Sequence, residues 1–151
     1  RRLIRLLSRP WLRPIVLAGL FGADRLSKYW AIHWLEPHGP VPVLPFFYLT
    51  YVENTGAAFG IGHSRNGFFI VLSLALLGVL FYLQRSWPKD DPWLQGGVLL
   101  VAGGALGNVY DRIAYGYVVD FLDFRVWPVF NVADSCVCVG AGLLAWGLRK
   151  E

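Results

Sequence analysis

The sequence predicts an all-α polytopic membrane protein with four transmembrane helices and a small β-like cradle on the extracytoplasmic side. Of its 151 residues, 56% are hydrophobic and 16% are charged, whereas a soluble domain carries about 25% charged residues. A helix needs roughly 20 apolar residues to cross the hydrocarbon core of a bilayer. Four segments approach this length, at about 12–35, 67–84, 93–114 and 130–148. Residues 1–151 are therefore expected to form one integral membrane domain.

The basic residues are better explained by membrane topology than by nucleic-acid binding, although the net charge is +4. They gather at the ends of the apolar segments and are not interleaved with aromatic residues on a polar surface. The N-terminal arm, the loop 85–92 and the C-terminal tail hold nine Lys and Arg residues, whereas the other two connections hold three. Because basic residues are retained on the cytoplasmic side, both termini are expected in the cytoplasm and no nucleic-acid partner is expected.

The first apolar segment begins like a cleavable signal peptide, because a basic arm precedes the apolar run IVLAGLFGA. Asp24, Arg25 and Lys28 then interrupt the run, and no A-x-A cleavage site precedes Trp34, so a retained helix is expected. Asp24 and Lys28 are four residues apart and can pair on one helical face. Charges at membrane depth usually face the protein interior. A structural ion pair and a functional role are equally compatible with this spacing.

Residues 41–60, VPVLPFFYLTYVENTGAAFG, favour one or two short strands that end in the turn-prone sequence ENTG. They lie within a connection at 36–66, which is too long for a simple loop and too aromatic for disorder. On the extracytoplasmic side, this segment would cover the mouth of the helical bundle.

The third apolar segment contains GGALGNVYDR at 103–112. Gly103 and Gly107 are four residues apart and predict a face on which a neighbouring helix can approach closely. One turn further on, Asn108, Asp111 and Arg112 form a polar cluster near the end of the segment. Glycines alone would be enough for packing, so the polar residues are expected to hold another polar group in place.

The start of the fourth segment carries a candidate for catalysis. Asn131 is a plausible helix N-cap, and Asp134 can reach back to the free backbone N–H groups of the first turn. Asp120 lies 14 residues earlier, on the other side of a short extracytoplasmic excursion that can bring the two carboxyl groups face to face. Two close carboxyl groups share a proton, so that one can activate water while the other polarises a carbonyl.

Asp123 competes with Asp120 for this role, since it lies three residues further on in VDFLDF. In an extended chain the two side chains would point to opposite faces, and spacing does not say which one faces Asp134. The histidines, at positions 33, 38 and 63, form no metal-ligand spacing, and no phosphate-binding loop is present. Cys136 and Cys138 are interpreted as small apolar packing residues. No cofactor and no metal are therefore expected.

Taken together, the motifs along the chain resemble those of the lipoprotein signal peptidase (signal peptidase II) family. In chain order they are Asp24-x-x-x-Lys28, Asn54-Thr55-Gly56-Ala57-Ala58-Phe59, Gly103-Gly104-Ala105-x-Gly107-Asn108-x-x-Asp111-Arg112, Val119-Asp120-Phe121 and Phe130-Asn131-x-Ala133-Asp134. Each motif alone is weak evidence, but five in this order across nearly the whole chain are specific. The loop DFRVWPVF, from Asp123 to Phe130, is shorter than in many members, which leaves its local contacts in doubt.

The resemblance implies roles for individual residues. Asp120 and Asp134 match the catalytic pair, which favours Asp120 over Asp123. The residues that match positions for holding substrate or shaping the site are Asn54, Asn108, Arg112 and Asn131. The residues expected to support the site structurally are Asp24, Lys28, Gly104, Gly107 and Asp111.

The implied activity is that of an aspartyl endopeptidase in the bacterial cytoplasmic (inner) membrane. It would remove signal peptides from diacylglyceryl-modified prolipoproteins, cutting just before the lipidated cysteine, with its active site near the extracytoplasmic face. Membrane lipids and globomycin-type inhibitors are the other implied partners, and a monomer is expected. The alternative is a non-enzymatic membrane protein, such as a lipid-binding module or a transporter subunit. A proton relay would place acids at successive depths, so acids clustered near one face favour the peptidase.

Overall fold

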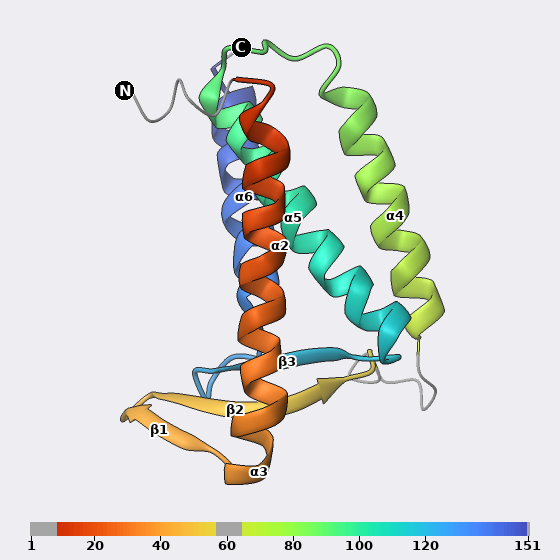
Figure 1. Cartoon of the computed structure of the whole chain (residues 1–151). Coiled ribbons are helices and arrows are strands. Elements are labelled where there is room, and N and C mark those ends of the chain that lie inside the picture. The colour runs from red at the N-terminus through yellow and green to blue at the C-terminus, as the bar shows by residue number, and fades with distance from the viewer. Residues whose placement is uncertain (1–8, 57–64, 151) are drawn as a thin grey trace.

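The computed structural model describes residues 9–56 and 65–150, which form a helical bundle with a small antiparallel sheet across one end (Figure 1). Its long helices are α2 (Leu12–Trp30), α4 (Asn66–Leu83), α5 (Pro92–Ala114) and α6 (Val132–Leu148). They occupy nearly the ranges of the four apolar segments, and the mostly helical class with a small sheet agrees with expectation. Ala57–Phe59 of the second motif and the arginines at positions 1, 2 and 5 lie outside the described residues.

Helix boundaries follow from local sequence. Asp91 caps α5, because its Oδ1 accepts hydrogen bonds from the backbone N–H groups of Trp93 (2.8 Å) and Leu94 (3.0 Å), and Pro92 occupies the first helical position, where no N–H is needed. Helix α2 continues through a π-helical turn, η1 (Ala31–Leu35), into the short α3 (Glu36–His38). Gly39 then ends the helix with φ +77°, a conformation that favours glycine.

The sheet has the order β1-β2-β3, with strands β1 (Val41–Leu44), β2 (Phe47–Asn54) and β3 (Val118–Asp123). The first two strands are those expected within 41–60. The third comes from the connection between α5 and α6, where the sequence allowed an extended run without predicting its pairing. Val119 and Phe121 of this strand pack against Ala31 and Leu35 of η1, so a small apolar core fixes the sheet to the end of α2.

Helices α5 and α6 pack backbone to backbone. Gly97 and Gly140 face each other, since a Cβ added to either would lie 2.9 Å from the carbonyl oxygen of the other. Figure 1 shows α6 alongside α2 and α5, while α4 stands to one side of the bundle. Small residues therefore set the close approach between these helices.

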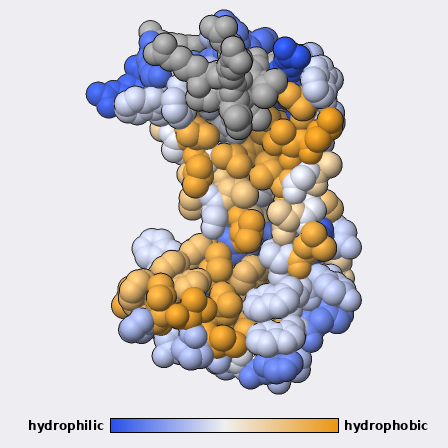
Figure 2. All heavy atoms as spheres, turned by 60° about the vertical axis from the view of Figure 1, so that its left-hand side comes forward, coloured by the Kyte–Doolittle hydropathy of each residue, from blue (hydrophilic) through white to orange (hydrophobic). Residues whose placement is uncertain are grey.

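The outer faces of the helices are apolar, as Figure 2 shows in orange around the middle of the molecule. No residue of α4 is buried, and α4 is the one helix in 9–56 and 65–150 that is long and apolar enough by composition to cross a membrane. Helix α6 is apolar but shorter. Charged residues interrupt α2 and α5, and most of them are paired in the interior. The number of membrane spans therefore stays a prediction.

Candidate active site

Strand β3 presents Asp120 to the interior. Only 2% of this residue is exposed, and its carboxylate accepts hydrogen bonds from Nδ2 of Asn54 (3.1 Å) and Nδ2 of Asn131 (2.8 Å). Asn54 reaches it because β2 and β3 run antiparallel, with Val52 opposite Asp120. Gly56 follows with φ +78° and donates its backbone N–H to Oδ1 of Asn54 (2.9 Å), which turns the Asn54 amide toward the carboxylate.

The first turn of α6 holds Asp134. Asn131 is the N-cap, and its Oδ1 accepts the backbone N–H of Asp134 (2.8 Å), while the backbone N–H of Asn131 donates to Oδ2 of Asp134 (3.2 Å). This reciprocal capping box is the structural role that the sequence allowed for Asp134. It leaves Oδ1 of Asp134 free to accept a hydrogen bond from Nδ2 of Asn108 (2.8 Å). Helix capping thus orients Asp134 without using the whole carboxylate.

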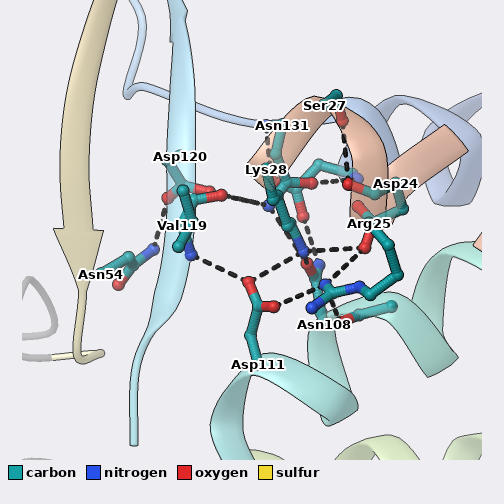
Figure 3. A network of polar contacts seen from close by, with 12 residues as sticks. Asp24, Arg25, Ser27, Lys28, Asn54, Asn108, Asp111, Val119, Asp120 and Asn131 are labelled. Carbon is teal, nitrogen blue, oxygen red and sulfur yellow. Dashed lines mark hydrogen bonds and ion pairs between the residues drawn. The ribbon is translucent and has the colours of Figure 1, made fainter. Parts of the chain in front are cut away.

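Asn131 is the residue shared by the two carboxyl groups. It is completely buried, and its Nδ2 donates to Asp120, to Oδ1 of Asn108 (3.1 Å) and to the carbonyl oxygen of Val119 (3.2 Å). Its Oδ1 and backbone N–H bind Asp134. One asparagine therefore brings Asp120 and Asp134 into one polar site. Figure 3 shows Asn131 and Asp120 in this network.

Asp123 is held in a different place. Its carboxylate accepts hydrogen bonds from Oγ1 of Thr50 (2.7 Å) and from the backbone N–H of Arg125 (2.8 Å). The hydrogen bond from Thr50, followed by that from Arg125, lowers the pKa of Asp123. The odd spacing along β3 thus separates Asp120 from Asp123, and of the two only Asp120 binds Asn131 among the contacts of the described residues.

Electrostatics distinguish these two acids as well. Burial raises the pKa of Asp120 to about 7, and the neighbouring charge of Asp134 adds to the increase. Desolvation and a like charge both disfavour the ionised form of a carboxyl group. Asp120 therefore retains its proton up to near-neutral pH, as a shared-proton pair requires.

A buried cluster of charges lies behind the site, between α2 and α5 (Figure 3). Nζ of Lys28 pairs with Asp24 (3.1 Å) and Asp111 (2.9 Å), and Nη2 of Arg25 pairs with Asp24 (2.7 Å) and with Asp111. The four groups balance to zero net charge, which makes their burial tolerable. Oδ2 of Asp111 also accepts the backbone N–H of Val119 (3.0 Å), the residue before Asp120.

Arg25 is the member of this cluster that the sequence pattern missed. It follows Asp24 directly, and adjacent residues of a helix do not face each other. Its long side chain nevertheless turns back to Asp111 and to the carbonyl oxygen of Gly107 (3.0 Å), and the ring of Tyr110 lies 4.3 Å from the guanidinium carbon. Side-chain length, which spacing rules ignore, makes this contact.

Gly104 and Gly107 make room for the site. A Cβ at Gly107 would collide with Oδ2 of Asp24, and one at Gly104 would collide with the carbonyl oxygen of Ala133. Gly107 lets the charge cluster approach α5, and Gly104 lets the start of α6 approach α5. Both residues therefore lie at the packing positions expected of site-supporting residues.

Arg112 lies at the edge of the site and contacts α4. Its Nη1 donates to Oδ1 of Asn66 (3.4 Å), its carbonyl oxygen accepts from Nδ2 of Asn66 (2.9 Å), and its guanidinium carbon lies 4.7 Å from the ring centre of Phe69. These contacts tie the end of α5 to the start of α4. A substrate contact for Arg112 stays a prediction.

A groove of about 780 Å³ leads to Asp134. Leu76, Val101 and Val137 line its apolar length, from α4, α5 and α6 respectively, and Trp127 lines it from the loop before α6. Asn108 and Asp134 provide polar groups in the lining. Apolar grooves with a few convergent polar groups are typical of ligand sites.

The described residues contain no cluster of three or more His, Cys, Asp or Glu side chains that could hold a metal ion. The chemistry that the described site offers is that of two carboxyl groups held by asparagine amides. Such a pair can act as general base and general acid.

Comparison with known proteins adds independent information. A family model described as "Signal peptidase (SPase) II" matches residues 16–149. Proteins named lipoprotein signal peptidase are 48% identical in Pelotomaculum thermopropionicum, with 91% of each chain covered, and 42% identical in Moorella thermoacetica, with 89% of this chain and 92% of the relative covered. The relative in Alteromonas mediterranea is 39% identical over 99% of this chain and 87% of its own.

Two solved structures share the fold. Both are of bacterial membrane enzymes, and each is 29% identical in sequence to this chain. The first, at 1.9 Å, superposes with a TM-score of 0.85 over 94% of this chain and 95% of its own. The second, at 2.3 Å, superposes with a TM-score of 0.82 over 93% and 89%.

Proposed function

This chain belongs to the signal peptidase II family, and on that premise we propose that it is an aspartic endopeptidase of the bacterial membrane that removes signal peptides from prolipoproteins. Asp120 and Asp134 are its catalytic pair. The observation that carries this assignment is the buried Asn131, whose Nδ2 donates to the carboxylate of Asp120 and whose backbone N–H donates to the carboxylate of Asp134, a residue that lines the groove.

The proposed mechanism uses one carboxyl group in each protonation state. Asp134, with two N–H donors on its carboxylate, takes a proton from water as the water oxygen attacks the scissile carbonyl carbon. Asp120 donates its proton to the carbonyl oxygen. As the tetrahedral intermediate collapses and the C–N bond breaks, Asp134 protonates the leaving nitrogen and Asp120 recovers a proton from a hydroxyl of the intermediate. No covalent intermediate is formed, and the cycle regenerates both groups.

The substrate is a prolipoprotein whose cysteine carries a diacylglyceryl group, and cleavage falls just before that cysteine. The apolar groove supports this proposal because it adjoins Asp134 and its lining suits lipid chains better than a polar peptide. Asn54, Asn108, Arg112 and Asn131 shape or hold this site. Globomycin-type inhibitors would compete for the same groove, and the protein works as a monomer without cofactor or metal.

The proposed topology places residues 1–151 in one domain with four spans, both termini in the cytoplasm and the sheet at the extracytoplasmic face. The exposed apolar side chains on the helices support the spans, and the distribution of Lys and Arg supports the orientation. Helices α2 and α5 can cross despite their charges because Asp24, Arg25, Lys28 and Asp111 neutralise one another in the interior.

A reaction with purified protein tests the proposed function. The protein should cleave a diacylglyceryl-modified prolipoprotein and leave the same proprotein uncleaved when it lacks the lipid, as followed by mass spectrometry of both products. Failure to cleave the lipidated form would contradict the peptidase assignment. Equal cleavage of both forms would contradict the role of the lipid in the groove.

The pH dependence of the same reaction tests the protonation states. Because burial and Asp134 raise the pKa of Asp120 to about 7, its proton is present below this pH and is lost above it. We expect kcat/KM to fall above about pH 7, approaching a tenfold decrease per pH unit. A profile that stays flat from about pH 6 to 9 would show that no group with this pKa supplies the acid.

A non-enzymatic role is not favoured. A proton relay would need acids at successive depths in the bundle. Asp120 and Asp134 instead meet at the sheet end, and Asp24 and Asp111 are neutralised by Arg25 and Lys28 in the adjoining cluster.

A further inference from the structure

The amide of Asn108 links the buried charge cluster to Asp134. Its Oδ1 accepts hydrogen bonds from Nζ of Lys28 (3.0 Å) and Nδ2 of Asn131 (3.1 Å), and its Nδ2 donates to Oδ1 of Asp134 (2.8 Å). An ammonium group can only donate hydrogen bonds. Lys28 therefore requires the oxygen of the Asn108 amide on its own side, which leaves the NH₂ group facing Asp134.

Lys28 itself has little freedom to move. Only 1% of it is exposed, and its ammonium group is fixed between Asp24 (3.1 Å) and Asp111 (2.9 Å). A cation held by two carboxylates is a rigid donor, because moving it would leave two acids in the interior with Arg25 as their one positive partner in the cluster. The orientation of the Asn108 amide thus depends on charges that do not touch the reacting atoms.

We propose that Lys28 is a positioning residue for the reaction, acting through Asn108 to keep an N–H donor on Asp134. This inference rests on the proposed function, since it gives the charge cluster a role in the chemistry of the pair. Without Lys28, the Asn108 oxygen keeps only the hydrogen bond from Asn131, whose Nδ2 is shared with Asp120 and Val119, and the amide can rotate and turn its oxygen toward Asp134. Two oxygen acceptors would then face each other, and the carboxylate would move out of alignment with the attacking water.

Two charge-balanced variants isolate this effect from the loss of the cluster. Asp24→Asn with Lys28→Met removes one negative and one positive charge and the donor to Asn108, leaving the ion pair of Arg25 with Asp111. Asp24→Asn with Arg25→Met also removes one negative and one positive charge but keeps Lys28 on Asn108 and Asp111. Neutral replacement of a buried ion pair is often tolerated, and thermal unfolding in detergent checks that each variant is folded.

The expected result is a selective loss of turnover. The double variant with Lys28→Met should have a kcat about 100-fold lower than wild type and nearly the same KM, as for a misplacement of about 1 Å. The double variant with Arg25→Met should have a kcat within about threefold of that of Asp24→Asn alone. If the two double variants lose activity equally, or if neither does, the proposal is wrong.

A double-mutant cycle with Asn108→Ala tests the route of the effect. If Lys28 acts through Asn108, adding Lys28→Met to the Asp24→Asn/Asn108→Ala background should lower kcat by less than about twofold further. A full additional loss would assign Lys28 a separate role and overturn the proposal.

A second variant places a shorter N–H donor than lysine at position 28. In Asp24→Asn with Lys28→Gln, the glutamine is about as long as the methionine of the first variant but ends in an N–H donor. The kcat of the Gln variant should be at least about tenfold higher than that of the Met variant. If the Met variant fails to fold, the kcat of the Gln variant is compared with that of wild type instead. A Gln variant that is folded but no more active than about 1% of wild type would contradict the proposal. Absence of cleavage by the wild-type protein would instead contradict the proposed function.

Discussion

Asp120→Asn is expected to lower the rate of prolipoprotein cleavage by at least about 10³-fold, and Asp134→Asn should do the same. In the first variant the amide cannot donate an acidic proton to the carbonyl oxygen, and in the second it cannot accept a proton from water. Asn is nearly isosteric with Asp but keeps only one acceptor oxygen, so each variant loses one of the two hydrogen bonds that the carboxylate accepts, and thermal unfolding in detergent checks that it is folded. Single-turnover assays with lipidated substrate would measure the loss.

Asp123→Asn is the matched control, since Asp123 lies on the same strand but binds Thr50 and Arg125. It should keep cleavage within about threefold of wild type. A loss comparable to that of Asp120→Asn would mean that the pair had been assigned to the wrong acid, and near wild-type turnover by Asp120→Asn or Asp134→Asn would refute the pair itself.

Asp120→Asn and Asp123→Asn should also differ in stability. The less active variant, Asp120→Asn, should be the more stable of the two at pH 8. The pKa of Asp120 is raised, so its favourable contribution exists at low pH and is lost as the pH rises through about 7. Asp120→Asn should therefore be at least as stable as wild type at pH 8. The pKa of Asp123 is lowered, so its contribution is present at pH 8 and Asp123→Asn should unfold at a lower temperature.

Gly104→Ala is expected to disrupt both packing and catalysis. The added Cβ would collide with the carbonyl oxygen of Ala133 and lie 2.9 Å from Cγ2 of Val137. A backbone oxygen cannot rotate away, so α6 must shift where it carries Asp134. We expect destabilisation of about 3 kcal/mol, at the upper end for overpacking, and about 100-fold lower kcat from displacement of the carboxylate.

Gly142→Ala provides the control within α6. A Cβ there has no atom within 4 Å, and alanine is favoured over glycine in a helix by about 1 kcal/mol. This variant should therefore be at least as stable as wild type and equally active. Equal behaviour of the two glycine variants in thermal unfolding and cleavage assays would show that the close contact at Gly104 is unimportant.

Much of the fold follows from local sequence. Apolar length predicted the helical segments, and the caps at Asp91 and Asn131 set where α5 and α6 begin. The pairing of β3 with β2 could not be predicted in the same way, because it depends on the packing of Val119 against η1. The four spans that apolar length predicted stay a prediction, since α4 is the one described helix that is long and apolar enough by composition to cross a membrane and charges interrupt α2 and α5.

From the sequence, the candidate residues of the site could be predicted, but not which of them lie together. Spacing brought Asp134 within reach of either Asp120 or Asp123, and only the family resemblance favoured Asp120. The strand then placed Asp120 on Asn131 and Asp123 on Thr50. The central position of Asn131 was not predicted, because capping explained its local role completely and its second set of contacts comes from residues distant in sequence.

The position of α4 has a consequence for how the enzyme would meet its substrate. Helix α4 buries none of its residues, and together with α5 and α6 it lines the groove to Asp134. A lipid-anchored substrate can then arrive sideways from the bilayer, so encounters depend on its density in the plane of the membrane. Rates measured in micelles should accordingly scale with the mole fraction of substrate in the detergent and fall on surface dilution, even at constant bulk concentration.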